Sequence, residues 1–397
     1  MNLKHRTRRS ACLLAAGAVA MAVAMGPAAL PAQASTSEQM VAAVDETPGA
    51  QGLYFEVQTV GSTGWHRELV AGGPAWSTPA MTVMNNGDIF IAAVDESTDT
   101  LYCYWQDYQT TGWTGGRVSA IGQAAGAPEI AAQKVMSPGQ PAEIAIVSGN
   151  PDPGPGNDPS FTYFYTQFQK SGWYSQTLPG GYYGQSSPDI AVGPNNEIVV
   201  AYDAGEILPN GFYLDVQPYL STNWSELHVG TGNYENAPRV EVQSSGNIII
   251  GDTIGVQNDF GGTEFYWSPA NDIDSWNAEH ISSTMGMLGQ GSVMADNPTA
   301  GSITLTAESD TSCVTAMTQD YGPNPWTTTK IGCPGLNAGP ISLAARADGG
   351  LIAADTSENG NTHFYWLAKN STTWTTEPTL TGLPDVSGGV AVASYTS

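Results

Sequence analysis

Short runs of alternating polar and apolar residues recur along the chain with a period close to fifty residues. Seven tryptophans mark this period, and each opens a short strand-like run: Trp65, Trp113, Trp173, Trp224, Trp276, Trp326 and Trp374. Successive tryptophans lie 48 to 60 residues apart. Self-similarity at a fixed period of this length indicates a repeat architecture.

Each repeat contains four predicted strands. An aromatic strand precedes most of the tryptophans, as at 101–106, and an aliphatic strand precedes that one, as at 89–94. The first strand of a repeat is short and often begins with proline, as at 79–83, and a turn rich in Asn and Gly follows it, as at 85–88. Four short strands joined by hairpin turns in every repeat are typical of the blades of a β-propeller.

Side-chain size predicts the order of the strands within a blade. Blades converge on a central axis, so the innermost strand has the least room and should carry small residues. The Pro-led strand fits, because it carries small residues such as Ala, Val, Ser and Gly. Pro at the first position of a strand also costs no ladder hydrogen bond. Residues 40–45 match the second strand of a blade and residues 389–394 match a first strand. We therefore expect an all-β, seven-bladed β-propeller of four-stranded blades, closed by a C-terminal inner strand that joins the N-terminal blade.

The first residues have the pattern of a secretory signal peptide. Four basic residues precede an apolar, Ala-rich stretch at 11–30, and residues 32–34 offer a small-residue cleavage site. We expect residues 1–34 to be removed and residues 35–397 to form the single propeller domain of a secreted, extracellular protein. No later apolar run is long enough to span a bilayer.

The charge of the chain limits its partners. Residues 1–34 hold four of the 12 Lys and Arg and none of the 37 Asp and Glu, so the mature formal charge falls from −25 to −29. Such a protein repels phosphate backbones and anionic lipid, which argues against nucleic acid and membrane surfaces as partners. The acidity is better explained by solubility than by storage of cations. We expect a monomer.

Three cysteines follow residue 34. Cys313 lies in the third strand of the sixth predicted blade and Cys333 ends the fourth, with a turn at 321–325 midway between them. We expect a disulfide across this hairpin, which an oxidising compartment permits. Cys103 is left as a buried, inert thiol.

An acidic residue recurs at the end of the second strand of most blades: Asp45, Asp95, Asp203, Asp252 and Asp355. Catalysis and calcium binding are two possible reasons. A turn-initiating Asp that accepts backbone N–H bonds explains the recurrence better, and no Asp-x-Asp-x-Asp calcium loop is present.

Aromatic residues outside the repeat supply the candidate site. The repeated tryptophans are better explained by packing between blades than by sugar stacking, because one occurs at the same place in every repeat. Other aromatic and polar residues lie shortly before an inner strand, near the expected mouth of the central channel: Trp76, Tyr182, Tyr183, Tyr234 and Glu235. We predict that they bind a sugar chain. Rings folded back onto the blades are the alternative.

Enzymatic motifs are missing from the chain. A glycosidase needs two carboxylates across a cleft, and no spacing singles out a pair among the 37 acids. Sialidases cluster arginines for the substrate carboxylate, yet the mature chain has only Arg67, Arg117, Arg239 and Arg346. The histidines lack metal-ligand spacing and no Gly-x-Ser-x-Gly elbow occurs. We predict no catalytic residue, no metal site and no cofactor.

The blade pattern resembles that of the β-propeller lectins of bacteria and fungi, the group that includes fucose-binding lectins. The resemblance lies in segments such as 187–192 and 197–201, followed by an aromatic strand and Gly-Trp or Asn-Trp, and it covers the mature chain. It implies the propeller fold and binding of an extracellular glycan, and in such lectins a site between adjacent blades. We predict a lectin-like, non-catalytic protein. The alternatives are a glycan-cleaving hydrolase on the same scaffold and a protein-binding surface scaffold.

Overall fold

The computed structural model divides the chain into two units, Met1–Ser35 and Thr36–Ser397. The residues that the structure describes all belong to the second unit: 37–45, 50–60, 62, 64–73, 75–135, 142–150, 161–166, 172–179, 188–203, 211–229, 238–254, 262–269, 275–282, 293–308, 313–322, 324–333, 341–356, 361–377 and 389–396. Their regular elements are all β-strands. Within these ranges no helix has the length and hydropathy needed to cross a membrane.

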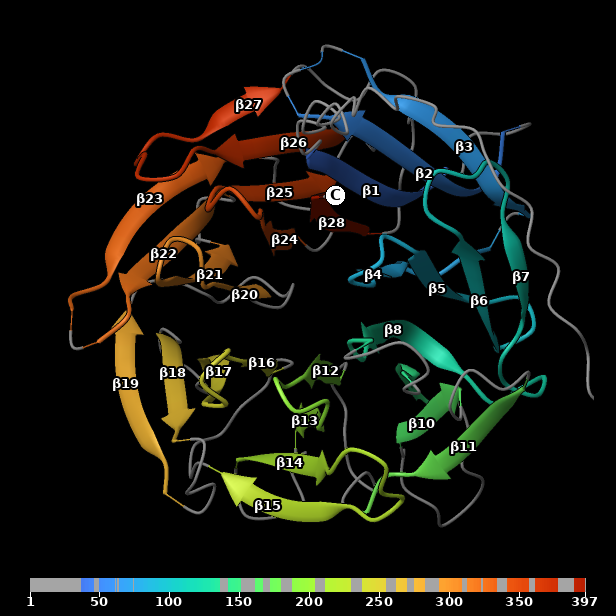
Figure 1. Cartoon of the computed structure of the whole chain (residues 1–397), viewed down its shortest axis with the longest axis horizontal. Coiled ribbons are helices and arrows are strands. Elements are labelled where there is room, and N and C mark those ends of the chain that lie inside the picture. The colour runs from blue at the N-terminus through green and yellow to red at the C-terminus, as the bar shows by residue number, and fades with distance from the viewer. Residues whose placement is uncertain are drawn as a thin grey trace, which may run out of the picture. The chain divides into compact units, whose positions relative to one another are not determined.

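The strands form seven antiparallel four-stranded sheets, the blades, arranged around a central axis (Figure 1). From its innermost to its outermost strand, blade 1 consists of β28 (Val390–Thr396), β1 (Ser37–Asp45), β2 (Gly52–Thr59) and β3 (His66–Gly72). In the same direction, blade 2 consists of β4 (Ala80–Val83), β5 (Ile89–Asp95), β6 (Thr100–Gln106) and β7 (Thr114–Arg117). Blade 3 consists of β8 (Ala125–Ala132), β9 (Ile144–Gly149), β10 (Phe161–Thr166) and β11 (Trp173–Thr177).

The remaining four blades follow the same order. Blade 4 consists of β12 (Asp189–Val192), β13 (Ile198–Asp203), β14 (Phe212–Gln217) and β15 (Ser225–Val229). Blade 5 consists of β16 (Arg239–Val242), β17 (Ile248–Ile254), β18 (Gly262–Ser268) and β19 (Asn277–Ser282). Blade 6 consists of β20 (Val293–Asn297), β21 (Ser302–Glu308), β22 (Val314–Asp320) and β23 (Thr327–Gly332). Blade 7 consists of β24 (Ser342–Ala345), β25 (Leu351–Thr356), β26 (Thr362–Leu367) and β27 (Thr375–Glu377).

The C-terminal strand closes the ring, as the sequence predicts. β28 pairs antiparallel with β1, with Ser37 opposite Thr396 and Ala43 opposite Val390. The seven inner strands contact one another in succession, and β28 contacts both β24 and β4. Because β1 and β28 complete the same blade, neither end of the chain leaves a free inner sheet edge.

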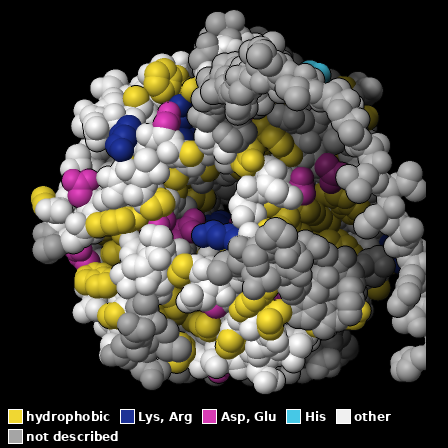
Figure 2. Space-filling view, viewed as in Figure 1, with side chains coloured by type: hydrophobic (Ala, Val, Ile, Leu, Met, Phe, Trp, Pro, Cys, Tyr) yellow, Lys and Arg dark blue, Asp and Glu magenta, His cyan; other side chains and the backbone are white. Residues whose placement is uncertain are grey.

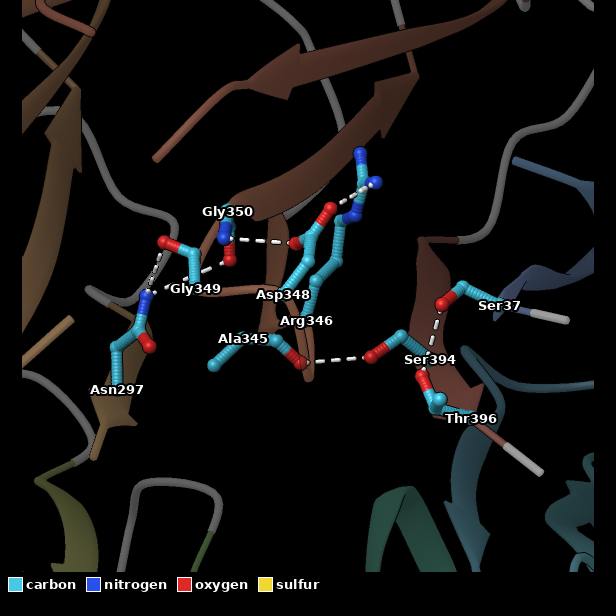
Figure 3. A network of polar contacts seen from close by, with 9 residues as sticks. All are labelled: Ser37, Asn297, Ala345, Arg346, Asp348, Gly349, Gly350, Ser394 and Thr396. Carbon is cyan, nitrogen blue, oxygen red and sulfur yellow. Dashed lines mark hydrogen bonds and ion pairs between the residues drawn. The ribbon is translucent and has the colours of Figure 1, made fainter. Parts of the chain in front are cut away.

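Side-chain hydrogen bonds reinforce the closure near the turns between first and second strands (Figure 3). Ser394 Oγ of blade 1 donates to the carbonyl oxygen of Ala345 in blade 7 at 2.7 Å. Asn297 Nδ2 of blade 6 donates to the carbonyl oxygen of Gly349 in the turn of blade 7 at 3.0 Å. Adjacent blades are therefore tied by polar contacts as well as by their apolar faces.

The turn between first and second strands has a fixed conformation. Gly87 in blade 2 has a φ of 92°, and Asn196 in blade 4 has a φ of 63°. This left-handed region is open to glycine and, among other residues, most readily to asparagine. The Asn- and Gly-rich composition of these turns is thus a backbone requirement.

The hydrophobic core is divided among the blade interfaces. The described residues form seven buried clusters, and each cluster joins the facing sides of two neighbouring blades. Successive side chains of a strand point to opposite faces, so each strand supplies residues to both neighbouring interfaces. Both faces of every blade are consequently buried, which explains the strongly apolar second strands.

The predicted disulfide is present. Cys313 and Cys333 are bonded across the β22–β23 hairpin, with their Cα atoms 3.9 Å apart. Cys103 is a free, buried thiol in blade 2. Burial raises the pKa of this thiol well above its usual range, so it stays protonated at neutral pH.

Candidate functional site

Of the five residues that the sequence singles out, only Trp76 lies within the described ranges. Its side chain is 7% exposed, and its ring packs edge-on against Tyr102 and Tyr104, with centroids 5.6 and 6.0 Å away. The ring is therefore part of the interface between blades 1 and 2 and offers no open face for stacking. Tyr182, Tyr183, Tyr234 and Glu235 lie outside the described residues.

The repeated tryptophans pack between blades. The ring of Trp113 in blade 2 lies edge-on to Phe55 in blade 1, with centroids 5.2 Å apart. Equivalent contacts occur between Trp65 and Phe364 at 5.0 Å, Trp224 and Tyr163 at 4.8 Å, and Trp326 and Phe265 at 5.3 Å. Each tryptophan thus fills the widening gap toward the preceding blade, which agrees with the packing role that their recurrence predicts.

The repeated acids divide into two groups. Asp95 accepts hydrogen bonds from the backbone N–H and the hydroxyl of Ser97, which is the predicted turn role. Asp45 instead binds Arg67 at 2.7 Å, and Asp355 contacts Nδ1 of His363 at 3.1 Å. The hydrogen bond to Asp355 raises the pKa of His363. Asp252 lies at the same position in blade 5, while the side chain of Asp203 lies outside the described part.

Charged side chains gather around the central opening (Figure 2). Arg239 Nη1 on β16 contacts Glu129 Oε1 on β8 at 2.6 Å and Asp189 Oδ1 on β12 at 3.9 Å. Inner strands therefore carry charges as well as the small residues that the sequence analysis expects. Burial raises the pKa of Glu129 and Asp189, and the nearby guanidinium opposes that effect. This arrangement binds three blades together and leaves Arg239 engaged by acids.

A groove of about 990 Å³ opens between blades 5 and 6. Blade 5 supplies the aromatic residues Phe265 and Trp267 and the carboxylate of Glu279. Blade 6 supplies Gln319 and, at the start of the β22–β23 turn, the ring of Tyr321. The turn between β16 and β17 adds the amides of Gln243 and Asn247. Rings, amides and a carboxylate thus converge on one concave surface.

Strand pairing explains how these side chains come to face each other. In blade 5, Ile249 lies opposite Trp267 and Gly251 lies opposite Phe265, which in turn lies opposite Glu279. Directly paired residues of antiparallel strands point to the same face, so these residues form one wall. In blade 6, Ile303 lies between Asp296 and Gln319 in the same manner and forms the opposite wall.

The equivalent space between blades 1 and 2 is filled by aromatic residues. Met40 occupies the position in blade 1 that Ile249 occupies in blade 5, since each pairs with the inner and the third strand of its blade. By the same register, Tyr395 of β28 corresponds to Gln243. Tyr395 packs edge-on against Tyr108 with centroids 4.9 Å apart. Where blade 1 has Tyr395 and Val57, blade 5 has Gln243 and Trp267, and the groove is open.

Two carboxylates stand behind the inner end of the groove. Glu241 pairs with Ile249, and Asp296 pairs with Ile303, so both point into the interface between blades 5 and 6. Burial, together with Asp189 and Asp296, raises the pKa of Glu241 to about 8. The Tyr321 hydroxyl donates a hydrogen bond to Asp296. Neither acid is among the described residues that line the groove.

Comparisons with known proteins agree on the fold. The sequence matches no known protein-family model and no curated protein sequence. In structure, the chain is similar to Aleuria aurantia lectin solved in complex with Fucα1-6GlcNAc, with 14% identity, a TM-score of 0.54, and coverage of 78% of this chain and 96% of that chain. Another structure of the lectin, described as a six-bladed β-propeller with a novel fucose recognition mode, gives 14% identity, the same coverage and a TM-score of 0.53.

A second solved structure gives a similar result. AofleA from Arthrobotrys oligospora is 11% identical, with a TM-score of 0.50, and the match covers 81% of this chain and 93% of that chain. At these identities the likeness concerns the fold. The propeller predicted from the sequence is therefore confirmed, and this chain has seven blades where the Aleuria lectin has six.

The sequence does contain a signal for the groove. Besides the seven repeated tryptophans, three others lie near the end of a third strand: Trp105, Trp267 and Trp366. They occur in only three blades, so repetition does not explain them. Trp267 is the one that lines the groove. Trp267 is thus marked in the sequence as a tryptophan that most repeats lack, whereas its distance from the channel mouth gives no such signal.

Proposed function

We propose that this chain is a secreted, non-catalytic carbohydrate-binding β-propeller that holds a glycan in the groove between blades 5 and 6. The proposal depends chiefly on one observation, which is that aromatic and polar side chains line the same groove of about 990 Å³. The rings are those of Trp267 and Tyr321, and the polar side chains are those of Gln243, Gln319 and Glu279. An aromatic ring offers its face to the C–H side of a sugar ring, while amides and a carboxylate bind hydroxyl groups.

The architecture supports the same proposal. Solved structures of similar fold include a lectin in complex with a fucose-containing disaccharide. The groove is large enough for a ligand of one or a few sugar units, since small-molecule sites commonly occupy about 300–1,000 Å³. The proposed partner is an extracellular glycan bound by a monomeric protein, without nucleic acid or membrane as further partners.

A glycan array of the mature protein tests the proposal. We expect selective binding that Trp267→Ala weakens by at least about tenfold, because the substitution removes the stacking surface. Trp105→Ala is the matched control, since Trp105 occupies the equivalent strand position in blade 2 and lies outside the groove. Binding that survives Trp267→Ala but is lost in Tyr234→Ala would move the site to the channel mouth. Absence of binding to any glycan would refute the proposed function.

A further inference from the structure

Glu68 in blade 1 is the equivalent of Glu279 in the groove, so the hydrogen bonds of the two carboxylates can be compared. Glu68 pairs with Phe55, as Glu279 pairs with Phe265, so the two acids are equivalent. Glu68 Oε2 accepts hydrogen bonds from Gln106 Nε2 at 2.8 Å and from Trp113 Nε1 at 3.2 Å. At this closed interface the neighbouring blade binds one oxygen of the acid, and the other, Oε1, lies 3.1 Å from Nε2 of His66 in the same strand.

Glu279 is engaged far less. Gln319 is the equivalent of Gln106, and its Nε2 donates a long hydrogen bond of 3.4 Å to Glu279 Oε2 and a shorter one of 2.6 Å to the carbonyl oxygen of Asn324. The equivalent tryptophan, Trp326, has a buried Nε1 without a hydrogen-bond partner among the described residues. The two hydrogen bonds that a Gln and a Trp donate to the acid between blades 1 and 2 are thus weakened or missing between blades 5 and 6. The Glu279 carboxylate faces the groove and can accept further hydrogen bonds.

The charge around the groove has one sign. The described wall residues include Glu279 and neither lysine nor arginine. Asp296 lies behind the inner end next to Glu241, whose raised pKa keeps it neutral, and Arg239 of the same blade binds Glu129 at 2.6 Å. A negative potential focused in a concave, partly apolar site attracts cationic groups and repels carboxylates and sulfates. The Trp267 ring adds a second favourable partner for an ammonium group through its π face.

From these observations we infer that the groove selects an amino sugar. The protonated amine of a glucosamine-type unit pairs with the Glu279 carboxylate, while the sugar ring packs on Trp267. This inference rests on the proposed glycan-binding function of the same groove and names the class of sugar that it takes. It also predicts that uronic acids, sialic acids and sulfated sugars are excluded.

Titration calorimetry with three oligosaccharides of equal length tests the inference. Near pH 6 the amines of a glucosamine tetramer are charged, whereas those of the N-acetylglucosamine tetramer are acylated and neutral, and a galacturonate tetramer is anionic. We expect the glucosamine tetramer to bind at least about tenfold more tightly than its N-acetylated form, and the galacturonate tetramer not to bind. The preference should shrink as salt screens the charge.

Two isosteric variants separate this inference from the proposed function. Glu279→Gln should weaken binding of the glucosamine tetramer at least about tenfold and binding of the N-acetylated tetramer much less, so that the preference for the free amine is lost. Glu68→Gln should leave both affinities unchanged. Equal binding of the two tetramers, or equal weakening of both by Glu279→Gln, would overturn the amino-sugar inference and leave glycan binding standing. A protein that binds no oligosaccharide at all would overturn both.

Discussion

The substitution Glu241→Gln should remove a pH-dependent loss of stability from the propeller. Burial is the largest cause that raises the pKa of Glu241 from 4.5 to about 8, and the nearby Asp189 and Asp296 carboxylates add to it. The folded protein therefore keeps a proton on Glu241 at neutral pH, while the unfolded chain has lost it. Because the unfolded state binds fewer protons, stability must fall as the pH rises.

The size of the effect follows from the two pKa values. The contribution is fully present below about pH 4.5 and is lost progressively as the pH rises to about 8. A difference of one bound proton changes the free energy of unfolding by about 1.4 kcal/mol per pH unit. Between pH 5 and pH 8 the wild-type protein should lose up to about 4 kcal/mol from this group. The side chain is not wholly excluded from solvent, so we expect about 2–4 kcal/mol.

Urea unfolding of the disulfide-bonded protein at several pH values measures this effect. Glu241→Gln keeps the shape of the side chain and cannot ionise, so its stability relative to wild type should rise between pH 5 and pH 8. Glu226→Gln, on the exposed outer strand β15, is the control and should follow wild type throughout. Other acids with raised pKa values, such as Glu129 and Glu143, are present in both proteins and cancel. Parallel curves for Glu241→Gln and wild type would refute the argument that Glu241 is held neutral by its surroundings.

Three further predictions concern the disulfide, a buried ring and the groove. Replacing both Cys313 and Cys333 by Ala should cost about 3 kcal/mol of unfolding free energy, because the bond closes a loop with a sequence separation of 20 residues, and reduced wild type should match the variant in urea. Trp76→Ala should lower stability by about 3–5 kcal/mol in the same assay and leave glycan affinity unchanged, since the ring is only 7% exposed. Gln243→Tyr should weaken glycan binding at least about tenfold on the array, because it places at the groove the residue type that Tyr395 supplies to the closed interface. Unchanged affinity in a variant that urea unfolding shows to be folded would mean that the groove is not the site.

The fold could be predicted because its determinants are local and repeated. Three features recur about every fifty residues: the Trp-led strands, the Asn- and Gly-rich turns and the short inner strands. A segment whose pattern is ambiguous in one repeat can therefore be assigned from the equivalent segments of the others. The closure of the ring also follows from the pattern, since a first-strand motif at the C-terminus can only complete a blade that lacks one. The disulfide follows from the same register, because Cys313 and Cys333 bracket one hairpin.

The charged inner strands could not be predicted from side-chain size. Size alone predicts small residues wherever blades converge, yet Arg239 and Glu241 of β16 occur there. The sequence contains their alternation with Val240 and Val242, but not the partners that make burial tolerable. Arg239 is held by Glu129, which lies 110 residues away in sequence and two blades away in the ring. Only the assembled ring brings such groups together.

The groove escaped prediction for a related reason. Its openness depends on what two blades present to each other, and thus on the pairing register of both. Tyr395 and Gln243 look unrelated in sequence, one near the C-terminus and one in a turn, yet they occupy equivalent positions beside a third-strand residue that is Val57 in one blade and Trp267 in the other. In a repeat protein, equivalent apolar residues fill most of the interfaces between blades in the same way. The groove arises where one interface departs from the others, because Gln243 and Trp267 leave open the space that Tyr395 fills between blades 1 and 2.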